Sequence, residues 1–189
     1  MKTRESGMPD EQMWDQFFDP VTILKGLEIQ NLTGTIVDLG CGYGTFTIPA
    51  AQMNQGQVYA LDIENEMILT TQEKAQKAGL GNVVAVQRDF ATLGTGIPDG
   101  SCEYVMLFNI LHAEEPLKIL AETRRILTSG GRVGVIHWVH DASTPRGPSL
   151  EIRPRPEQCQ VWLKQAGFEL VKSKIDLPPY HYGLLGRKA

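Results

Sequence analysis

Short apolar runs alternate with longer amphipathic stretches along most of the chain. The short runs predict strands at residues 35–39, 57–62, 82–87, 103–108 and 131–138. The amphipathic stretches predict helices at 45–54, 65–78 and 115–127, with a short helical turn near Ala91. Near-continuous apolar strands that alternate with helices are typical of a parallel sheet covered on both faces. We therefore expect an α/β fold.

The segment before this region is predicted to be helical. Asp10 can cap a helix that runs through Phe18 and ends at Asp19-Pro20, and a second short helix is expected at 21–30. The apolar residues of the first helix lie on one stripe, formed by Met13, Trp14, Phe17 and Phe18. Such a stripe suits either a lid over a ligand or a helix docked on the core, and the spacing does not separate the two.

A long loop, residues 141–156, follows the fifth predicted strand. A connection of about 15 residues is uncommon inside a compact domain and is usually functional or mobile. Its arginines, Arg146, Arg153 and Arg155, could meet an anionic substrate, but Glu151 among them favours a solvated loop. The remaining elements are a helix near 157–165 and strands near 168–175 and 181–187.

Composition narrows the class of protein. A chain of 189 residues with 42% hydrophobic content can bury one sizeable core, so we expect a single domain. The 18 basic and 22 acidic residues give a net charge of −4, which predicts no general attraction to nucleic acid. The three cysteines are widely spaced and suggest neither a disulfide framework nor a metal site. The absence of a signal peptide or a long apolar run predicts a soluble, cytoplasmic protein.

A glycine-rich turn follows the first predicted strand, with glycines at 40, 42 and 44, and Asp62 ends the second strand. A glycine turn after a buried strand lets the backbone approach a ligand, and an acidic residue about 20 positions later can bind ribose hydroxyls. A nucleoside cofactor is therefore expected. Thr45 stands at the position where a dinucleotide-binding turn has its third glycine, and Asp38 would repel a pyrophosphate but suit a cation. These two residues oppose a nicotinamide-dependent oxidoreductase.

At these residues the chain resembles the class I S-adenosylmethionine-dependent methyltransferases, whose first motif has the pattern of residues 37–44. Further ordered matches to the family cover roughly residues 34–140 and lie at Asp62, Arg88-Asp89-Phe90, 98–105, 109–112 and 130–133. Within the class, the chain is most similar to the small-molecule group that includes quinone and arsenite methyltransferases. Arsenite enzymes rely on several cysteines, and only Cys41, Cys102 and Cys159 are present here.

The resemblance implies a Rossmann-like, doubly wound, seven-stranded sheet, mostly parallel, with an antiparallel last strand between the fifth and sixth. It also implies an N-terminal helical cap segment, residues 1–33, and a methyltransferase domain, residues 34–189, within a single domain. The cofactor would be S-adenosylmethionine, with S-adenosylhomocysteine as product and no metal. The cofactor-binding positions carried over are Asp38, Gly40, Cys41, Gly42, Asp62, Ile63, Asp89, Phe90 and Asn109. Asp38 and Asp89 also have structural interpretations, as a turn cap and a helix cap.

Methyl transfer from a sulfonium requires alignment and exclusion of water more than acid–base chemistry. His112, at the end of the fourth strand, is the best candidate for a base or an acceptor-orienting group, and otherwise a polar rim residue. His137 follows the same logic less strongly, because its neighbour Trp138 could be the inward residue. Cys41 is disfavoured as a nucleophile because no basic residue lies near it in sequence.

The function predicted is methyl transfer to a small-molecule acceptor by in-line displacement, with no nucleic acid or membrane partner. Two alternatives remain: a non-catalytic S-adenosylmethionine-binding module, and an RNA or protein methyltransferase that works with a partner chain. Leu177-Pro178-Pro179-Tyr180 is similar to a signature of enzymes that methylate base amines, but it lies after the wrong strand and is expected to end one. The sequence leaves the acceptor and the oligomeric state open.

Overall fold

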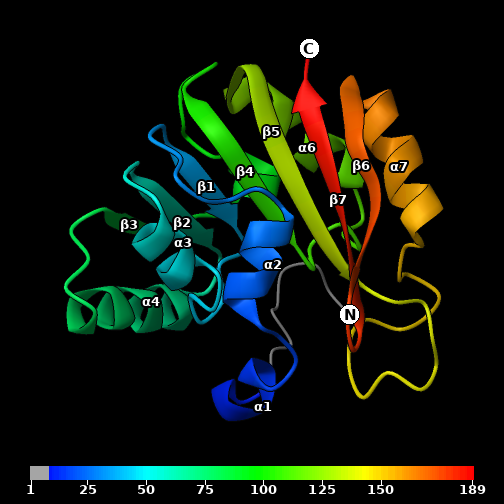
Figure 1. The fold of residues 1–189 in the computed structure, drawn as a ribbon, viewed down its shortest axis with the longest axis horizontal. Coiled ribbons are helices and arrows are strands. Elements are labelled where there is room, and N and C mark those ends of the chain that lie inside the picture. Colours follow the sequence, from blue (N-terminus) through cyan, green and yellow to red (C-terminus); the bar gives the residue numbers. More distant parts are fainter. Residues whose placement is uncertain (1–8) are drawn as a thin grey trace.

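The computed structural model describes residues 9–189, so residues 1–8 of the expected N-terminal cap lie outside the described part. The described chain forms a seven-stranded sheet in the order β3-β2-β1-β4-β5-β7-β6 (Figure 1). The strands are β1 Ile36–Leu39, β2 Val58–Asp62, β3 Val83–Gln87, β4 Cys102–Phe108, β5 Leu127–Trp138, β6 Phe168–Leu177 and β7 His181–Lys188. Strand β7 pairs antiparallel with both β5 and β6, and the pairs from β3 to β5 are parallel. The predicted α/β fold and strand arrangement are confirmed.

The helices fall close to their predicted positions: α1 Glu11–Asp15, α2 Pro20–Gly26, α3 Thr47–Met53, α4 Asn65–Lys77, α5 Phe90–Leu93, α6 Pro116–Ile126 and α7 Pro156–Gln165. The first helix is shorter than predicted and does not reach Phe18. Asp19 caps a new helix instead, accepting a hydrogen bond from the Thr22 N–H at 3.2 Å, with Pro20 in the first helical position.

Two further boundaries differ from the prediction. The helix expected at 21–30 ends at Gly26, because Glu28 adopts the left-handed region, with φ of 61°, and a right-handed helix cannot continue through it. Strand β5 begins four residues early, at Leu127, which pairs with Cys102 ahead of the irregularity between Cys102 and Tyr104. Pro178 and Pro179 lie in the turn between β6 and β7, as expected of a strand end.

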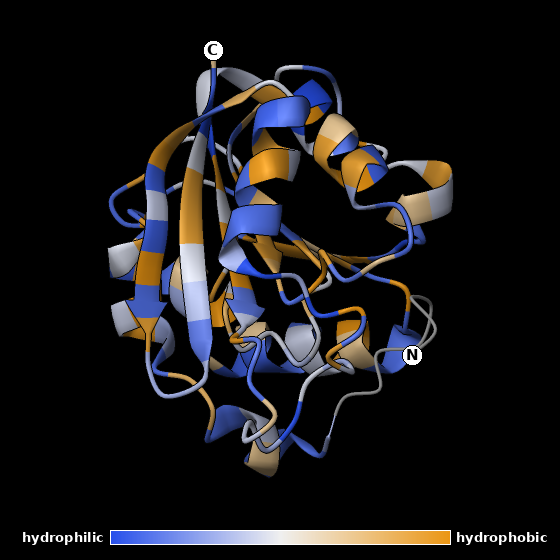
Figure 2. Cartoon of the chain, turned by 90° about the vertical axis from the view of Figure 1, so that its right-hand side faces the viewer, coloured by the Kyte–Doolittle hydropathy of each residue, from blue (hydrophilic) through white to orange (hydrophobic). Residues whose placement is uncertain are grey.

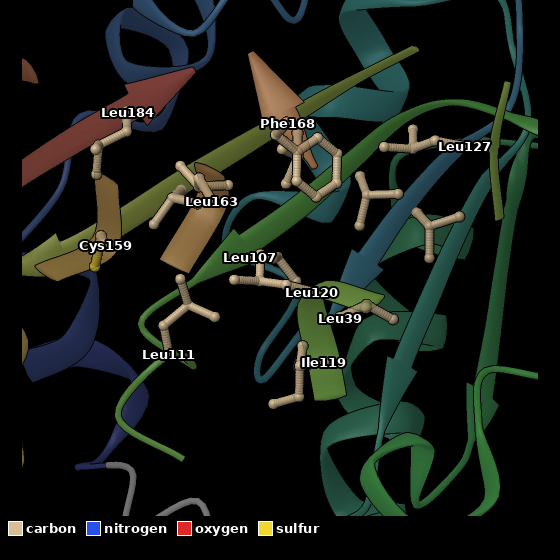
Figure 3. Close-up of a cluster of buried hydrophobic side chains, with 14 of the residues drawn as sticks. Leu39, Leu107, Leu111, Ile119, Leu120, Leu127, Cys159, Leu163, Phe168 and Leu184 are labelled. Carbon is tan, nitrogen blue, oxygen red and sulfur yellow. The ribbon is translucent and has the colours of Figure 1, made fainter. Parts of the chain in front are cut away.

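Both faces of the sheet are buried, which is why its central strands are almost entirely apolar. Successive residues of β4 alternate between two clusters: Val105 and Leu107 pack with α6 and α7, whereas Tyr104 and Met106 pack with α2 and α3. Figure 3 shows the first cluster, where Leu120 of α6 and Leu163 of α7 meet the sheet. Figure 2 shows the corresponding bands of hydrophobic and hydrophilic residues along the outer strands and the helices beside them.

The order of the strands determines where a ligand can bind. Strand β1 has β2 on one side and β4 on the other, so the chain reverses direction across the sheet between β1 and β4. Ligands of doubly wound folds bind at such a point, outside the carboxyl ends of the strands. In Figure 1 this edge lies toward the bottom, where α1 also lies. Among the described residues, no helix combines the length and apolarity needed to cross a membrane.

Candidate active site

A cleft opens along the carboxyl ends of the parallel strands. All nine predicted cofactor positions line it. Eight of them lie in β1 and β2 or follow β1, β2 and β3: Asp38, Gly40, Cys41, Gly42, Asp62, Ile63, Asp89 and Phe90. The ninth, Asn109, lines it from the turn after β4, together with His112. The sheet therefore brings together residues that are up to 74 positions apart, from 38 to 112.

The glycine turn after β1 folds tightly against the end of β2. The Gly40 and Cys41 N–H groups both donate to the Leu61 carbonyl, at 2.8 and 3.1 Å. Gly40 has φ of 81°, and a Cβ atom there would stand 2.8 Å from Cδ1 of Ile110. Only glycine combines that backbone conformation with that close approach. Glycine at this position thus allows the turn after β1 to pack closely enough to form one wall of the cleft.

Asp62 links the glycine turn to the end of β2. One carboxylate oxygen accepts from the Gly42 N–H and the other from the Glu64 N–H, both at 3.0 Å. Burial raises the pKa of this carboxyl, and the two backbone donors oppose that shift. Each oxygen still has a lone pair available, so Asp62 can accept hydrogen bonds from hydroxyl groups placed in the cleft.

Asp38 is buried at the floor of the cleft, with 2% of its surface exposed. Its Oδ2 accepts a 2.6 Å hydrogen bond from the hydroxyl of Thr47, the first residue of α3. Burial raises the pKa of Asp38 to about 7, against the opposing effect of the Thr47 bond. A cation bound nearby would lower this pKa and keep the carboxylate charged. The structural and the ligand-binding interpretations of Asp38 are therefore compatible.

Asp89, which follows β3, also combines a structural role with a position in the cleft. Its Oδ1 caps α5 by accepting from the Thr92 N–H at 3.1 Å, and the residue also lines the cleft beside Phe90. Arg88 lines the cleft as well, but its guanidinium donates to the carbonyls of Leu93 and Gly94, both at 2.8 Å. Arg88 thus secures the loop after α5.

Asn109 has unusual geometry for a residue other than glycine. Its φ is 58°, in the left-handed region, and its N–H donates to the Ile136 carbonyl at 2.8 Å. Both polar atoms of its side-chain amide are buried and have no partner among residues 9–189. Buried amides are normally hydrogen-bonded, and strained backbone is concentrated at functional sites. Asn109 therefore fits a residue whose partner is a bound molecule.

The part of the cleft over β4 and β5 has aromatic walls. Trp14, Phe46, Phe108 and Trp138 line it; the ring centroids of Phe46 and Phe108 are 4.7 Å apart and those of the two tryptophans 6.4 Å. Analysis of the sequence did not single out Phe46 or Phe108 as site residues. Phe108 could have been found as the last residue of β4, immediately before Asn109.

The segment that contains α1 and the residues just after it both docks on the core and borders the cleft. Phe17 is buried, with its ring 5.3 Å from that of Trp138, whereas Trp14 lines the cleft. Polar contacts attach this segment to the glycine turn and to α4: the Tyr43 hydroxyl donates to the carbonyl of Pro9, which precedes α1, at 2.9 Å, and Glu11 pairs with Lys74. Within the stripe, Phe17 thus packs on the core, Trp14 borders the cleft and Met13 is 41% exposed, so the lid interpretation stays a prediction.

The loop after β5 is not the solvated connection expected from its arginines. Arg153 is buried, with 7% of its surface exposed, and its guanidinium donates to the carbonyls of Pro148 at 2.8 Å and Val139 at 2.9 Å. Further acceptors are the carbonyls of Asp141 and Arg146 and the hydroxyl of Thr144. The loop therefore folds around one arginine. Residues 146–148 line the cleft, and Arg155 is exposed.

The two candidate histidines lie in contact, but only one reaches the cleft. His112 lines it, whereas His137 is fully buried and is not part of the lining formed by the described residues. Nε2 of His137 is 3.3 Å from Nδ1 of His112. Burial lowers the pKa of His112 to about 4 and that of His137 well below its usual value. Trp138 lines the cleft, as considered from the sequence, since strand neighbours point to opposite faces.

Cys41 and the two remaining histidines, His140 and His181, have structural surroundings. Burial raises the pKa of the Cys41 thiol well above its usual value, which opposes a nucleophilic role. His140 contacts the Leu150 carbonyl through Nε2 at 3.0 Å, and His181 is buried between Phe18 and Trp138. Among residues 9–189, no group of three or more histidine, cysteine or acidic side chains is arranged to hold a metal ion.

The sequence profile of the family described as "Methyltransferase domain" matches residues 36–131. Aklanonic acid methyltransferase DauC of Streptomyces sp. (strain C5) is 30% identical over 175 residues, covering 86% of this chain and 77% of DauC. An uncharacterized 37.1 kDa protein in transposon TN4556 of Streptomyces fradiae is 31% identical over 161 residues, covering 78% of this chain. Demethylmenaquinone methyltransferase of Listeria welshimeri is 29% identical over 128 residues, covering 66% of this chain. The chain spans 45% and 51% of the lengths of the latter two proteins.

Solved structures show the same architecture. A SAM-dependent methyltransferase from Aquifex aeolicus superimposes with a TM-score of 0.82 at 25% identity, covering 95% of this chain and 94% of that one. The [4+2]-cyclase SpnF superimposes with a TM-score of 0.77 at 18% identity, covering 97% of this chain and 84% of SpnF, and at that identity the likeness concerns the fold alone.

Proposed function

Since the chain belongs to the methyltransferase-domain family of class I S-adenosylmethionine-dependent enzymes, we propose that it transfers a methyl group from S-adenosylmethionine to a small-molecule acceptor. The observation that carries this proposal is the cleft at the switch point of the sheet, with buried carboxylates on one side and the unpartnered amide of Asn109 on the other. An elongated ligand with a nucleoside at one end and a cation near its middle fits this distribution.

The donor would lie over β1, β2 and β3. Asp62 would bind the ribose hydroxyls beside Ile63, and Asp89 with the Phe90 backbone would contact the adenine. The backbone of Gly40, Cys41 and Gly42 would lie against the donor, with Asp38 and Asn109 on its methionine part. When bound, the donor would supply a methyl carbon to a lone pair of the acceptor. As the new bond forms, the bond between this carbon and sulfur would break, and its electron pair would stay on sulfur. The protein aligns the reactants and excludes water.

The acceptor would occupy the half of the cleft over β4 and β5. The aromatic walls there favour an apolar body, and His112 supplies a polar contact, with His137 acting behind it. Two relatives named above, the aklanonic acid and demethylmenaquinone methyltransferases, carry the names of small molecules. The net charge of −4 also supports a small acceptor over a free nucleic acid.

Calorimetric titration with S-adenosylmethionine and S-adenosylhomocysteine tests the donor site. Asp62→Ala should weaken binding by about 1.5 to 3 kcal/mol, the worth of a hydrogen bond to a charged group. Asp176→Ala is the matched control, because Asp176 pairs with Lys174 at 2.8 Å outside the cleft. Absence of binding by the unaltered protein would refute the proposed function, and equal affinities of the two variants would remove Asp62 from the site.

Acceptor screening tests the transfer itself. Candidate acceptors are incubated with the donor, and turnover is followed by homocysteine release after hydrolysis of S-adenosylhomocysteine. Mass spectrometry then identifies the methylated product. Suppose that the protein binds the donor and methylates no small molecule, but turns over in the presence of a partner protein or an RNA. That result would favour the alternative of an RNA or protein methyltransferase that works with a partner chain.

A further inference from the structure

The contact between His112 and His137 constrains the protons of both rings. His112 follows β4 and His137 belongs to β5, and these adjacent parallel strands bring Nε2 of His137 to 3.3 Å from Nδ1 of His112. The rings are nearly perpendicular, at 82°. When both imidazoles are neutral, one nitrogen of this contact donates and the other accepts. The arrangement that prevails decides whether His112 presents a proton or a lone pair to the cleft.

The surroundings of His137 favour one arrangement. His137 is fully buried, and its Nδ1 has no partner among the described residues. If His112 donated to His137, the remaining proton of His137 would lie on Nδ1 as a buried N–H with no acceptor in hydrogen-bond geometry, since the neighbouring Trp138 backbone offers only a weaker contact, and such an N–H is rare in proteins. If His137 instead donates from Nε2, its Nδ1 carries no proton and leaves only a lone pair unused, which costs less than a buried N–H without a partner. In that arrangement His112 accepts at Nδ1 and has its proton on Nε2.

A His112 that lines the cleft with an N–H group is a poor base and a good donor. Burial lowers its pKa to about 4, so the ring is neutral at physiological pH. A phenol with a pKa of about 10, like that of tyrosine, would lose its proton to such a ring only against an equilibrium of roughly a millionfold. Tyr182 stacks on His137, burial keeps the nearby His181 neutral by lowering its pKa to about 3, and the positive charge of Arg153 further opposes protonation of His137. The acceptor must therefore reach the site without needing His112 as a base.

We propose that His137 is a positioning residue that holds His112 with Nε2–H toward the cleft, so that the site binds a planar phenol or enol acceptor as its preformed oxyanion. This inference rests on the proposed function and specifies its acceptor class. The aromatic walls formed by Trp14, Phe108 and Trp138 suit a flat, conjugated body. Arg146 also lines this half of the cleft and adds positive charge that favours an anion.

The charges of the reaction balance without a base. A lone pair of the anionic acceptor forms the bond to the methyl carbon, the carbon–sulfur bond breaks with its electron pair on sulfur, and the negative and positive charges cancel. No proton is transferred in this step. The hydrogen bond from His112 lowers the pKa of the acceptor hydroxyl in the site and orients its oxygen.

Nitrogen-15 NMR of the imidazoles tests the tautomers with no ligand present. The chain has four histidines, so single variants assign every signal. We expect His112 and His137 both as the Nε2–H tautomer at pH 7, with His112 neutral to below pH 5. His137→Phe should release His112 into a mixture of tautomers, whereas His140→Gln should leave it unchanged, because the observed contact of His140 is with the Leu150 carbonyl. A His112 protonated at Nδ1, or titrating at pH 6 or above, would overturn the proposal.

Paired variants of His112 test the donor role. Glutamine retains an N–H donor but cannot act as a base, and leucine retains neither. With a series of ring-substituted phenols and naphthols as probes, kcat/KM of His112→Leu should fall roughly 10- to 100-fold, the effect of a lost hydrogen bond to a charged group. That of His112→Gln should stay within about 10-fold of the unaltered protein. Equal losses in the two variants would contradict the donor role.

The pH dependence tests the ionised acceptor. The pH at which kcat/KM is half-maximal should follow the hydroxyl pKa of each probe, whereas a midpoint common to all probes would indicate a base on the protein and overturn the proposal. No turnover of any phenol or naphthol by a protein that binds the donor would overturn the acceptor class. Loss of donor binding in calorimetry would instead refute the proposed function, while the NMR tautomers would still report on His112.

Discussion

Replacement of Arg153 by methionine removes the group around which the acceptor-side loop folds. The side chain is buried and donates to the carbonyls of Pro148 and Val139 at 3.0 Å or less. Each hydrogen bond from a charged donor is worth about 1.5 to 3 kcal/mol, so these two of the five acceptors alone account for about 3 to 6 kcal/mol. The loop can open and return its carbonyls to water, and we therefore expect a destabilisation of about 2 to 4 kcal/mol.

Arg155→Met is the matched control, because Arg155 is exposed and lies only two residues away. Urea unfolding measures the stability of both variants, and hydrogen exchange followed by mass spectrometry measures the opening of residues 141–152. Arg153→Met should exchange faster in this segment and raise KM for the acceptor. Donor affinity should hold, since the proposed donor residues lie mainly over β1 to β3. Identical exchange and stability in the two variants would refute the assignment of Arg153 as the organising residue of the loop.

Three further predictions concern the core and the floor of the cleft. Leu120→Ala should lower the free energy of unfolding by about 2 to 5 kcal/mol in urea titrations, whereas Leu117→Ala, at a position 42% exposed, should change it by about 0.5 kcal/mol or less. The pKa of Asp38 is about 7 in the folded protein and 3.8 when unfolded, so between these pH values the folded state keeps a proton that the unfolded state has lost. Stability therefore falls as pH rises from about 4 to 7. Melting temperatures of Asp38→Asn and the unaltered protein should therefore diverge in favour of the variant over this window, and parallel curves would contradict the raised pKa. Asn109→Gly should remove both the strain of the left-handed backbone and the cost of the buried, unpartnered amide, so thermal stability should be equal or higher. Calorimetric affinity for the donor should fall. Unchanged affinity would exclude a donor contact by the Asn109 amide.

The features predicted correctly from the sequence depend on local patterns. Strand β1 and its glycine turn can be recognised because an apolar run, the glycine spacing and Asp62 all lie within 27 residues, from 36 to 62. The antiparallel placement of β7 was implied by the resemblance to a family, and the pairing of β7 with β5 and β6 confirms it.

The features that escaped prediction depend on contacts between distant segments. The burial of Arg153 arises because a loop folds back on it, and the composition of that loop is the same whether it is solvated or folded. The position of His137 behind His112 requires the pairing of β4 with β5, which brings together residues 25 positions apart. The hydrophobic stripe continues to Phe18 and so does not reveal that α1 ends at Asp15, before Asp19 caps a separate helix.

The placement of the tryptophans gives this protein a built-in optical reporter. Of the three tryptophans in the chain, Trp14 and Trp138 line the cleft from segments far apart in the sequence, and the third, Trp162, packs against the core from α7. Emission from the first pair depends on what occupies the cleft, whereas Trp162 contributes a constant background that Trp162→Phe removes. Association and release of either reactant can thus be followed in real time by intrinsic fluorescence, without a label near the reacting groups.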